Sequence, residues 1–269
     1  MSYIQANTIA GEFKKEMLKV KIFHEREKMG KEAAHDVSDV IQKLLEQKNE
    51  INIIFAAAPS QNDFMKEFAA DNSIQWQKIN AFHMDEYIGL DKEAPQGFGN
   101  FLKERIFGKV PFKSVHYING QAENLSDECN RYAGLLQKYP VDIVCLGIGE
   151  NGHIAFNDPP VADFQDQKQV KVVELEQACR QQQVNDGCFA TLSEVPAQAF
   201  TLTIPALMKA NYMFCMVPTK FKAEAVFHTL YDEINEKCPA TILRTKKDAI
   251  LYLDKASASL LQKNEYYET

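Results

Sequence analysis

One histidine of this chain lies in a setting suited to proton transfer. His153 follows the most apolar segment of the sequence, with a carboxamide two residues earlier at Asn151 and a carboxylate five residues later at Asp158. The same turn contains three glycines, Gly147, Gly149 and Gly152. Glycines allow a tight turn whose backbone amides approach an oxyanion or a sugar hydroxyl closely, and a histidine can both give and take a proton near neutral pH. The turn therefore predicts an acid/base site, and a histidine that is only hydrogen-bonded in the core is the alternative.

Two adjacent acidic residues form a second candidate. Asp85 and Glu86, followed by Tyr87, come directly after an apolar segment that predicts a strand. Carboxylates at the carboxyl end of a strand, next to the protein interior, can have shifted pKa values and act as general acids or bases. A solvated loop, or a helix capped by Asp85, is the alternative for this tripeptide on its own.

Alternating strands and helices must position these residues. Short apolar and β-branched segments are typical of strands buried on both faces, and apolar residues at helical spacing indicate amphipathic helices between them. We expect strands over residues 51–57, 79–84, 141–148, 199–204, 212–217 and 249–254. We expect helices over residues 31–47, 59–71, 97–107 and 220–229.

This alternation predicts an α/β fold, with a mostly parallel sheet and helices on both of its faces in a Rossmann-like arrangement. No linker or change of composition divides the chain, so we expect a single domain over residues 1–269. In open α/β sheets, ligands bind beyond the carboxyl ends of the strands. The segments after Ala57, Met84, Gly147 and Val217 are therefore the expected places for a site.

The composition argues against several classes of protein. The chain has 269 residues, of which 45% are hydrophobic and 25% are charged, as in ordinary globular proteins. Its 30 basic and 37 acidic residues give a net charge of −7, so a generic nucleic-acid partner is not expected. The sequence lacks a run of about 18 apolar residues that would predict a membrane span.

The cysteines bear on the cellular compartment. Six of them are scattered along the chain without a C-x-x-C pair, so they form no pattern typical of a zinc or redox site. Residues 1–17 lack the apolar region of a signal peptide. We therefore expect reduced thiols, a cytoplasmic location and no metal site.

The two motifs resemble those of a known family. HMDEYIGL at residues 83–90 and GIGENGHIAFNDP at residues 147–159 are similar to the paired signature of glucosamine-6-phosphate deaminases (isomerases), whose relatives include 6-phosphogluconolactonases. The likeness extends to residues 118–120, 222–223 and 239–243, and so covers most of the chain. Tyr87, Phe156 and Asn157 look more like the deaminase branch than the lactonase branch.

The resemblance implies roles for the acidic pair and the histidine turn. The family's aspartate that matches Asp85 moves a proton between C2 and C1 of the open-chain sugar, and the histidine that matches His153 assists ring opening. This chain has Asn151 where aspartate is usual and Asp158 where glutamate is usual. Asparagine orients an imidazole by hydrogen bonding but brings no charge, so the proton relay is expected to differ. Glu86 is expected to support the same site.

A larger departure from the family lies after the first buried strand. The family usually has a glycine-rich loop there, whose backbone amides hold the sugar phosphate, whereas this chain reads AAAPSQND over residues 56–63. Ser60, Gln61 and Asn62 could bind sugar hydroxyls with their side chains. Ser60 and Asp63 also fit a capping pattern, and a helix capped by its own serine has fewer free amides for a phosphate.

Two cations could compensate for the lost glycines. Lys222 matches a lysine that the family uses near the phosphate, and a lysine on a helix surface is the alternative. Arg180 lies where the family carries a phosphate-binding arginine, but Gln183 fits that position equally well.

These expectations combine into one hypothesis. We expect an enzyme of carbohydrate metabolism that isomerises an amino-sugar phosphate, such as glucosamine 6-phosphate, to the ketose phosphate with release of ammonia. Proton transfers of this kind need no metal and no organic cofactor. A sugar lactonase, which is a hydrolase, and a sugar-binding sensor without catalysis are the alternatives. The expected partner is a small sugar or sugar phosphate, not a nucleic acid or a membrane. The sequence leaves open whether the chain forms a homo-oligomer.

Overall fold

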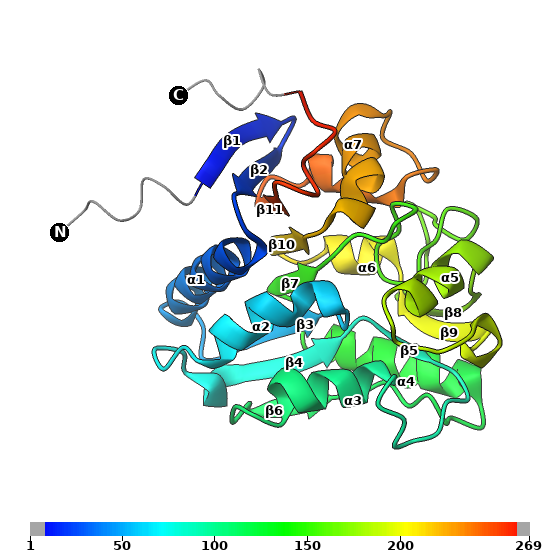
Figure 1. Cartoon of the computed structure of the whole chain (residues 1–269). Coiled ribbons are helices and arrows are strands. Elements are labelled where there is room, and N and C mark those ends of the chain that lie inside the picture. Colours follow the sequence, from blue (N-terminus) through cyan, green and yellow to red (C-terminus); the bar gives the residue numbers. More distant parts are fainter. Residues whose placement is uncertain (1–8, 263–269) are drawn as a thin grey trace.

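A sheet of eight strands runs through the centre of the protein in the computed structural model, which describes residues 9–262 (Figure 1). In sheet order the strands are β1 (Ile9–Lys15), β2 (Leu18–Phe23), β11 (Ala249–Asp254), β10 (Tyr212–Val217), β7 (Ile143–Leu146), β3 (Ile51–Phe55), β4 (Ile79–His83) and β6 (Ser114–His116). Neighbouring strands are parallel throughout, except that β1 and β2 form an antiparallel hairpin at one edge. The mostly parallel sheet expected from the sequence is confirmed.

Helices cover both faces of this sheet (Figure 1). They are α1 (Arg26–Leu45), α2 (Asn62–Ala69), α3 (Phe98–Leu102), α4 (Leu125–Lys138), α5 (Gln177–Asn185), α6 (Ile204–Met208) and α7 (Ala223–Tyr231). Successive side chains of a strand point to opposite faces, so Ile53 packs in one core with Val37 of α1, whereas Ile54 packs in the other core with Tyr132 of α4. The predicted α/β fold with helices on both faces is therefore confirmed.

Several helical segments contain turns that are not α-helical. Pro59–Gln61 and Lys220–Lys222 are 3-10 turns ahead of α2 and α7, and Lys103–Phe107 continues α3 as a π-helical turn. The remaining 3-10 turns are Trp76–Lys78, Leu192–Glu194 and Pro239–Thr245. The turns at 59 and 220 follow β3 and β10 closely, so they lie at the sheet edge where a ligand is expected.

A second, antiparallel sheet of three strands corrects one expectation and excludes one alternative. Its order is β5 (Asp85–Tyr87), β9 (Gln198–Leu202) and β8 (Val170–Glu174). The segment 199–204 was expected to continue the parallel sheet, but β9 pairs with β5 and β8 instead. Asp85 and Glu86 lie in a strand, neither in a solvated loop nor at a helix start. An apolar run indicates a buried strand, but it does not identify the partner of that strand.

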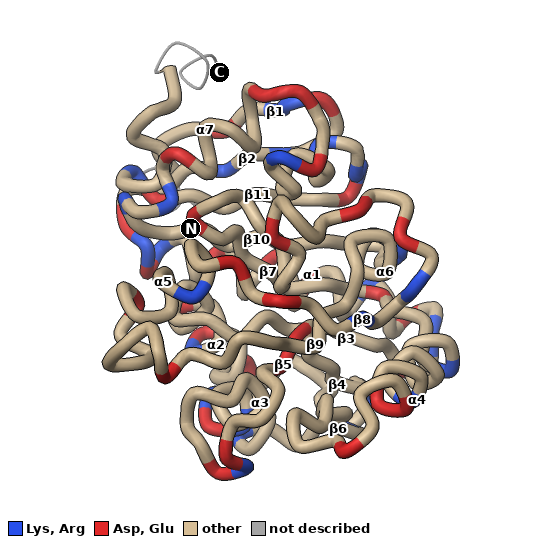
Figure 2. Tube along the Cα trace, turned by 90° about the vertical axis from the view of Figure 1, so that its right-hand side faces the viewer, with Lys and Arg blue, Asp and Glu red and all other residues tan. Residues whose placement is uncertain are grey.

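The expected single domain stays a prediction, because it includes residues 1–8 and 263–269, which lie outside the described residues. The prediction that residues 1–17 lack a signal peptide likewise falls in part on residues 1–8, outside the described residues. Acidic and basic residues are interspersed along the trace, without a broad basic face in the view of Figure 2. None of the described helices is long and apolar enough to cross a membrane.

Candidate active site

A cleft of about 230 Å³ lies at the carboxyl ends of β3, β4, β7 and β10. Its wall includes Ala57, Ser60, Met84, Asp85, Gly147, Gly149, His153, Pro218 and Lys222. These residues come from the four segments at which the sequence predicted a site. Parallel strands end at the same edge of a sheet, and this brings the four segments together.

Strand β9 joins the acidic motif to the histidine turn. Asp85 pairs with Thr201 across the small sheet. The hydroxyl oxygen of Thr201 accepts a hydrogen bond from the backbone N–H of Phe156 at 3.1 Å, and the side-chain amide of Asn157 donates to the carbonyl of Leu202 at 2.8 Å. The acidic motif and the histidine turn therefore line one cleft, held by a strand that the sequence did not assign to the site.

Two side chains hold one edge of the His153 imidazole. Its Nδ1 lies 2.7 Å from Oδ1 of Asn151 and 3.0 Å from Oδ1 of Asp158. Nδ2 of Asn151 donates to Asp158 at 2.8 Å and to Glu176 at 3.1 Å. The structure thus brings the predicted supporting residues against the histidine and adds Glu176, which no sequence motif had marked.

These contacts determine which ring nitrogen carries the proton. A carboxylate only accepts hydrogen bonds, so the Asn151 atom that faces Asp158 and Glu176 is the amide nitrogen. Oδ1 of Asn151 then faces His153 and accepts from its backbone N–H at 3.1 Å. Nδ1 of the ring is therefore the donor, and Nε2 is left as the acceptor for a ligand.

The charge of Asp158 fits this arrangement. Burial raises the pKa of Asp158, but hydrogen bonds and charge interaction with His153, together with the hydrogen bond from Asn151, outweigh burial and hold this pKa below its ordinary value. Asp158 is 1% exposed, so its charge acts on the imidazole with little screening by water. The carboxylate therefore stays ionised beside the imidazole.

Asp85 is poised to accept a proton. Asp85 is 7% exposed and lines the cleft. Burial, and then the neighbouring Glu86 carboxylate, raise the pKa of Asp85 well above its ordinary value. A carboxylate with a raised pKa is a stronger base, which suits the removal of a proton from carbon.

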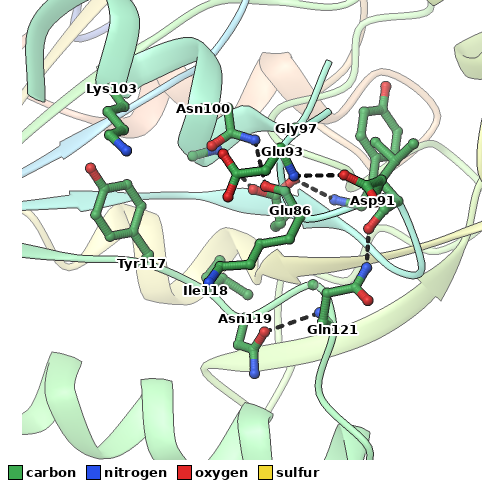
Figure 3. Close-up of a pocket in the computed structure, with 15 residues that line it drawn as sticks. Glu86, Asp91, Glu93, Gly97, Asn100, Lys103, Tyr117, Ile118, Asn119 and Gln121 are labelled. Atoms are coloured by element: carbon green, nitrogen blue, oxygen red, sulfur yellow. Dashed lines mark hydrogen bonds between the residues drawn. The ribbon is translucent and has the colours of Figure 1, made fainter. Parts of the chain in front are cut away.

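Glu86 points away from the cleft. Successive strand residues face opposite sides, and the Glu86 carboxylate accepts hydrogen bonds from the backbone N–H groups of Tyr87, Phe98 and Gly99 at 2.9, 2.9 and 2.8 Å. It lines a separate cavity of about 310 Å³ together with Tyr117 (Figure 3). The expectation that Glu86 supports the site stays a prediction: its carboxylate lies outside the cleft, and its charge contributes to the raised pKa of Asp85. The residue ties β5 to the start of α3.

The loop after β3 differs from the expectation at two of its three predicted residues. Ser60 lines the cleft, but Gln61 is fully buried and donates to the carbonyl of Met216 at 3.2 Å. Asn62 lies outside the cleft wall, where its Oδ1 accepts from Nε of Arg105 at 2.8 Å. Nε2 of Gln61 and Oδ1 of Asn62 are therefore bonded within the protein, and Asn62 lies outside the cleft wall.

The predicted capping by Ser60 is also wrong. Neither the 3-10 turn at Pro59–Gln61 nor α2 has a side-chain cap. The Ser60 hydroxyl oxygen accepts from Nε2 of Gln61 at 3.1 Å, and Asp63 pairs with Arg26. The Ser60 hydrogen is thus free to donate to a ligand in the cleft.

The two predicted cations have opposite outcomes. Lys222 is 6% exposed and lines the cleft; burial lowers its pKa, although the charges of Asp186 and Glu150 oppose this. Arg180 lies outside the cleft, because its guanidinium donates to the carbonyls of Leu192 and Val195, both at 2.8 Å.

The position that Arg180 was expected to fill belongs to Gln183, which lines the cleft from the same helix, α5. The expectation for Arg180 as a ligand of the phosphate is therefore wrong.

Among the predicted glycines, Gly149 lines the cleft and Gly152 does not. Gly152 has a φ of +82°, and a Cβ atom there would lie 2.6 Å from Sγ of Cys238. Its lack of a side chain therefore serves the turn and its packing, and the expectation that Gly152 binds substrate is wrong.

The cleft wall also contains residues that the sequence reasoning missed, among them Thr219, Phe221, Arg26 and Asp186. Thr219 and Phe221, which is 78% exposed, neighbour Lys222 in the segment after β10, so their position could have indicated them. Arg26 and Asp186 come from helix ends that carry no motif.

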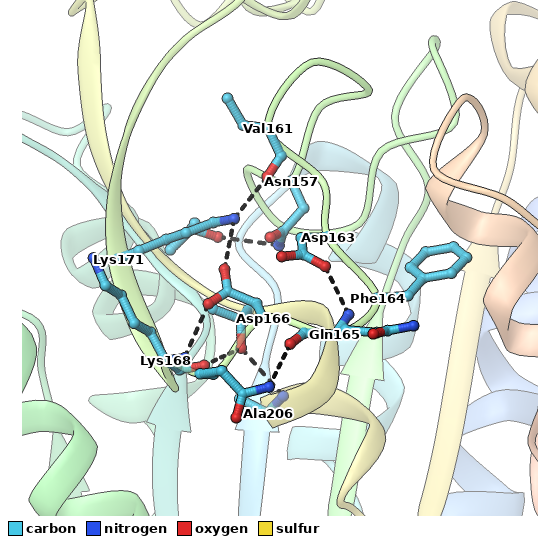
Figure 4. Close-up of polar contacts among 12 residues, drawn as sticks. Asn157, Val161, Asp163, Phe164, Gln165, Asp166, Lys168, Lys171 and Ala206 are labelled. Atoms are coloured by element: carbon cyan, nitrogen blue, oxygen red, sulfur yellow. Dashed lines mark hydrogen bonds and ion pairs between the residues drawn. The ribbon is translucent and has the colours of Figure 1, made fainter.

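The loop that supplies Asp158 is tied to the small sheet (Figure 4). Nζ of Lys171 in β8 donates to the carbonyl of Val161 at 2.6 Å and pairs with Asp166 at 2.9 Å. Asn157 adds its bond to the carbonyl of Leu202, described above. The small sheet therefore fixes both ends of this part of the site.

One cluster of metal-ligating types lies here among the described residues. Ligand atoms of His153, Asp158 and Cys179 lie within 4.8 Å of one another. His153 and Asp158 already bond each other, and burial, followed by the charge of Asp158, raises the pKa of the Cys179 thiol. A metal ligand must be a thiolate, so this set fits a metal ion poorly.

Known proteins share these sequence features. A family described as glucosamine-6-phosphate isomerases/6-phosphogluconolactonase matches residues 24–252. Over 189 residues, 70% of each chain, the protein is 37% identical to glucosamine-6-phosphate deaminase of Bacillus cytotoxicus. It is 36% identical to glucosamine-6-phosphate deaminase of a Bacillus cereus strain over the same share of both chains.

Solved structures share the fold. A monomeric glucosamine-6-phosphate deaminase superposes with a TM-score of 0.81 at 28% identity, over 90% of this chain and 99% of that chain. A 6-phosphogluconolactonase from Thermotoga maritima superposes with a TM-score of 0.71 at 20% identity, over 88% of this chain and 100% of that one, and this likeness shows the fold alone. The chain belongs to the glucosamine-6-phosphate isomerase/6-phosphogluconolactonase family.

Proposed function

We propose that this protein is an enzyme that converts an amino-sugar phosphate, glucosamine 6-phosphate or a close relative, to the ketose phosphate and ammonia. One observation carries the proposal: Asp85 and His153 line the same cleft, and both are nearly buried. A base with a raised pKa and an imidazole with a free Nε2 are the two groups that such an isomerisation requires. The relatives at 36 to 37% identity are glucosamine-6-phosphate deaminases.

The proposed reaction begins with ring opening. Nε2 of His153 accepts the proton of the C1 hydroxyl and returns it to the ring oxygen, while Nδ1 stays bonded to Asn151 and Asp158. The product is the open-chain aldehyde with its amino group on C2. Asp158 stabilises the transient imidazolium, since a nearby carboxylate favours the charged form.

Asp85 then moves the C2 proton. Its carboxylate removes that proton while the C1 aldehyde oxygen takes a proton from solvent water, and an enolamine forms. The protonated Asp85 returns its proton to C1 and the nitrogen releases a proton to solvent, which leaves an imine at C2. Water adds to this imine, ammonia leaves, and the C2 ketone remains, so that atoms and charge balance over the sequence.

Lys222 and Ser60 are proposed to hold the phosphate end of the substrate. Both line the cleft, and Lys222 has no hydrogen-bond partner among the described side chains that would compete with a phosphate oxygen. A charge-assisted hydrogen bond from a buried ammonium is stronger than a neutral one. We further propose a cytoplasmic location, because all six cysteines are free.

The test is a substrate panel on the full chain. Glucosamine 6-phosphate, free glucosamine and 6-phosphogluconolactone are each incubated with the protein, and ammonia, ketose and released acid are measured. Ammonia and ketose phosphate formed in equal amounts from glucosamine 6-phosphate is the expected result. Acid released from the lactone alone would replace the proposal by lactonase activity, and binding of a sugar without any product would replace it by a sensor.

A further inference from the structure

Arg26 lies in the wall of the cleft although nothing in the sequence placed it there. It is the first residue of α1. Its Nε donates to Oδ2 of Asp63 at 2.6 Å, and its Nη2 lies 3.4 Å from the carbonyl oxygen of Pro59. Within residues 9–262, Nη1 has no hydrogen-bond partner. Asp63 thus fixes the guanidinium while its outer edge keeps donors for a ligand.

A close approach between two helices holds Arg26 in this place. A Cβ atom on Gly30, one turn further along α1, would lie 2.7 Å from Cβ of Asp63 and 2.8 Å from the backbone nitrogen of Phe64. Only glycine therefore lets α1 lie this close to the first turn of α2. The same contact sets Arg26 beside Pro59, next to Ser60 of the loop that replaces the glycine-rich one.

The charges of the cleft leave room for a second cation. Lys222 and Arg26 are the Lys and Arg residues among the described residues of its wall, and Asp85 and Asp186 are the acidic ones. Arg180, the other expected cation, is bound elsewhere. A phosphate monoester carries nearly two negative charges near neutral pH, and one buried lysine does not balance them.

We infer that Arg26 is the second cation of the phosphate subsite, and that it acts with Lys222 and Ser60 in place of the missing glycine-rich loop. This inference rests on the proposed function in that the substrate carries a phosphate. A guanidinium presents parallel donors that match two phosphate oxygens, which an ammonium does not. Recognition at this subsite thus moves from backbone amides to a side chain supplied by a different helix.

The test compares Arg26→Gln with a matched arginine. Arg105 binds the same loop from another side, through Nε to Asn62, and lines a neighbouring cavity but not the cleft. Calorimetric titrations with inorganic phosphate, glucosamine 6-phosphate and glucosamine are run on the full chain, on Arg26→Gln and on Arg105→Gln. The thermal unfolding midpoint of each variant shows that it is folded.

We expect Arg26→Gln to lower the affinity for inorganic phosphate and for glucosamine 6-phosphate by about 10-fold or more, which is the effect of one charge-assisted hydrogen bond. The affinity for glucosamine should not change. Arg105→Gln should match the unaltered protein. Arg26→Lys keeps the charge without the fork, so it should recover only part of the loss. If Arg26→Gln does not fold, Arg26→Lys carries the same comparison.

The results separate this inference from the proposed function. Phosphate binding that depends on Arg26, in a protein that produces no ammonia, would support the subsite and overturn the deaminase proposal. Ammonia production with an unchanged KM in Arg26→Gln would overturn the subsite and leave the deaminase proposal in place. Equal losses in Arg26→Gln and Arg105→Gln, or no binding of phosphate to the unaltered chain, would also overturn the subsite.

Discussion

The imidazole of His153 occupies the space that a side chain on Gly149 would need. A Cβ atom on Gly149 would lie 2.1 Å from Cε1 and 2.4 Å from Nε2 of His153. The backbone N–H of Gly149 donates to the carbonyl of His153 at 2.9 Å, and the ring itself is held by Asn151 and Asp158. The glycine is therefore required by the histidine itself.

This contact predicts that Gly149→Ala abolishes turnover by displacing the imidazole. We expect a loss of about 10²-fold or more in kcat, since general acid/base catalysis contributes at least that much. Gly134 in α4 is the matched control, because a Cβ atom there would meet nothing within 4 Å. Gly134→Ala should keep full activity and stabilise the helix by about 0.5 to 1 kcal/mol. Equal activity of the two alanine variants in a steady-state assay would contradict the prediction.

Asp85→Asn is expected to lower kcat by about 10²-fold to 10⁴-fold, because the amide cannot accept the C2 proton. Binding of the substrate should survive, since the side chain keeps its size. Steady-state kinetics gives kcat, and calorimetry gives the affinity. A variant that keeps its kcat would show that another group is the base.

The same substitution makes a prediction about stability and pH. The folded protein binds the proton of Asp85 more tightly than the unfolded chain, because burial and then Glu86 raise its pKa. Ionisation of Asp85 therefore lowers the free energy of unfolding as the pH rises from the unfolded value of about 3.9 through the folded pKa. Asn cannot ionise, so Asp85→Asn should unfold at a higher temperature than the unaltered protein at alkaline pH and show no such gain below about pH 3.9. Thermal melts across this range would contradict the prediction if the difference between the two proteins did not grow with pH.

Asn151→Asp is expected to disturb the histidine site, although it restores the residue that is usual in the family. It replaces the donor that serves Asp158 and Glu176 by an oxygen, and so sets three carboxylates together. We expect a lower kcat/KM and a lower unfolding midpoint. Adding Glu176→Gln returns one donor and should recover part of both losses, with a coupling energy of about 0.5 to 3 kcal/mol. Independent effects of the two substitutions in a double-mutant cycle would show that Glu176 does not act through residue 151.

Lys222→Ala is expected to lower the affinity for a phosphorylated ligand by roughly 10-fold to 150-fold and to leave the affinity for the free sugar nearly unchanged. Burial lowers the pKa of Lys222, so its charge is lost at a lower pH than that of a surface lysine. Affinity for the sugar phosphate should therefore fall as the pH rises from neutral to alkaline, and Lys222→Arg should flatten this fall, because arginine stays charged. Calorimetry measures this affinity from neutral to alkaline pH. If the affinity of Lys222→Arg fell with pH as steeply as that of the unaltered protein, a group other than Lys222 would be responsible for the fall.

Local sequence patterns predicted the parts of the site that lie at strand ends. The runs 51–57, 79–84 and 141–148 became β3, β4 and β7, and the polar residues after them meet in the cleft. Patterns could not show which partner a polar side chain would find. Arg180 and Asn62 are occupied by other parts of the protein, and only the folded structure shows this.

Long-range packing explains what the sequence could not show. Arg26 reaches the cleft because α1 and α2 touch at Gly30, and Asp85 reaches the histidine turn because β9 bonds to both. Neither contact produces a periodic pattern or a fixed spacing in the sequence, so the sequence alone does not reveal it. Glu86 lies outside the cleft for a local reason, since strand alternation turns it to the face opposite Asp85.

The hairpin β1–β2 limits how copies of this protein can associate. Among the described residues β1 is the outermost strand on its side of the sheet, and its register shifts between Ile9 and Gly11. Glu12, Lys14 and Lys15 place charges along the same strand. Charged residues and an irregular register discourage the pairing of two sheet edges. Where copies of the chain meet in solution, the central sheet would therefore not extend from one copy into the next through this edge.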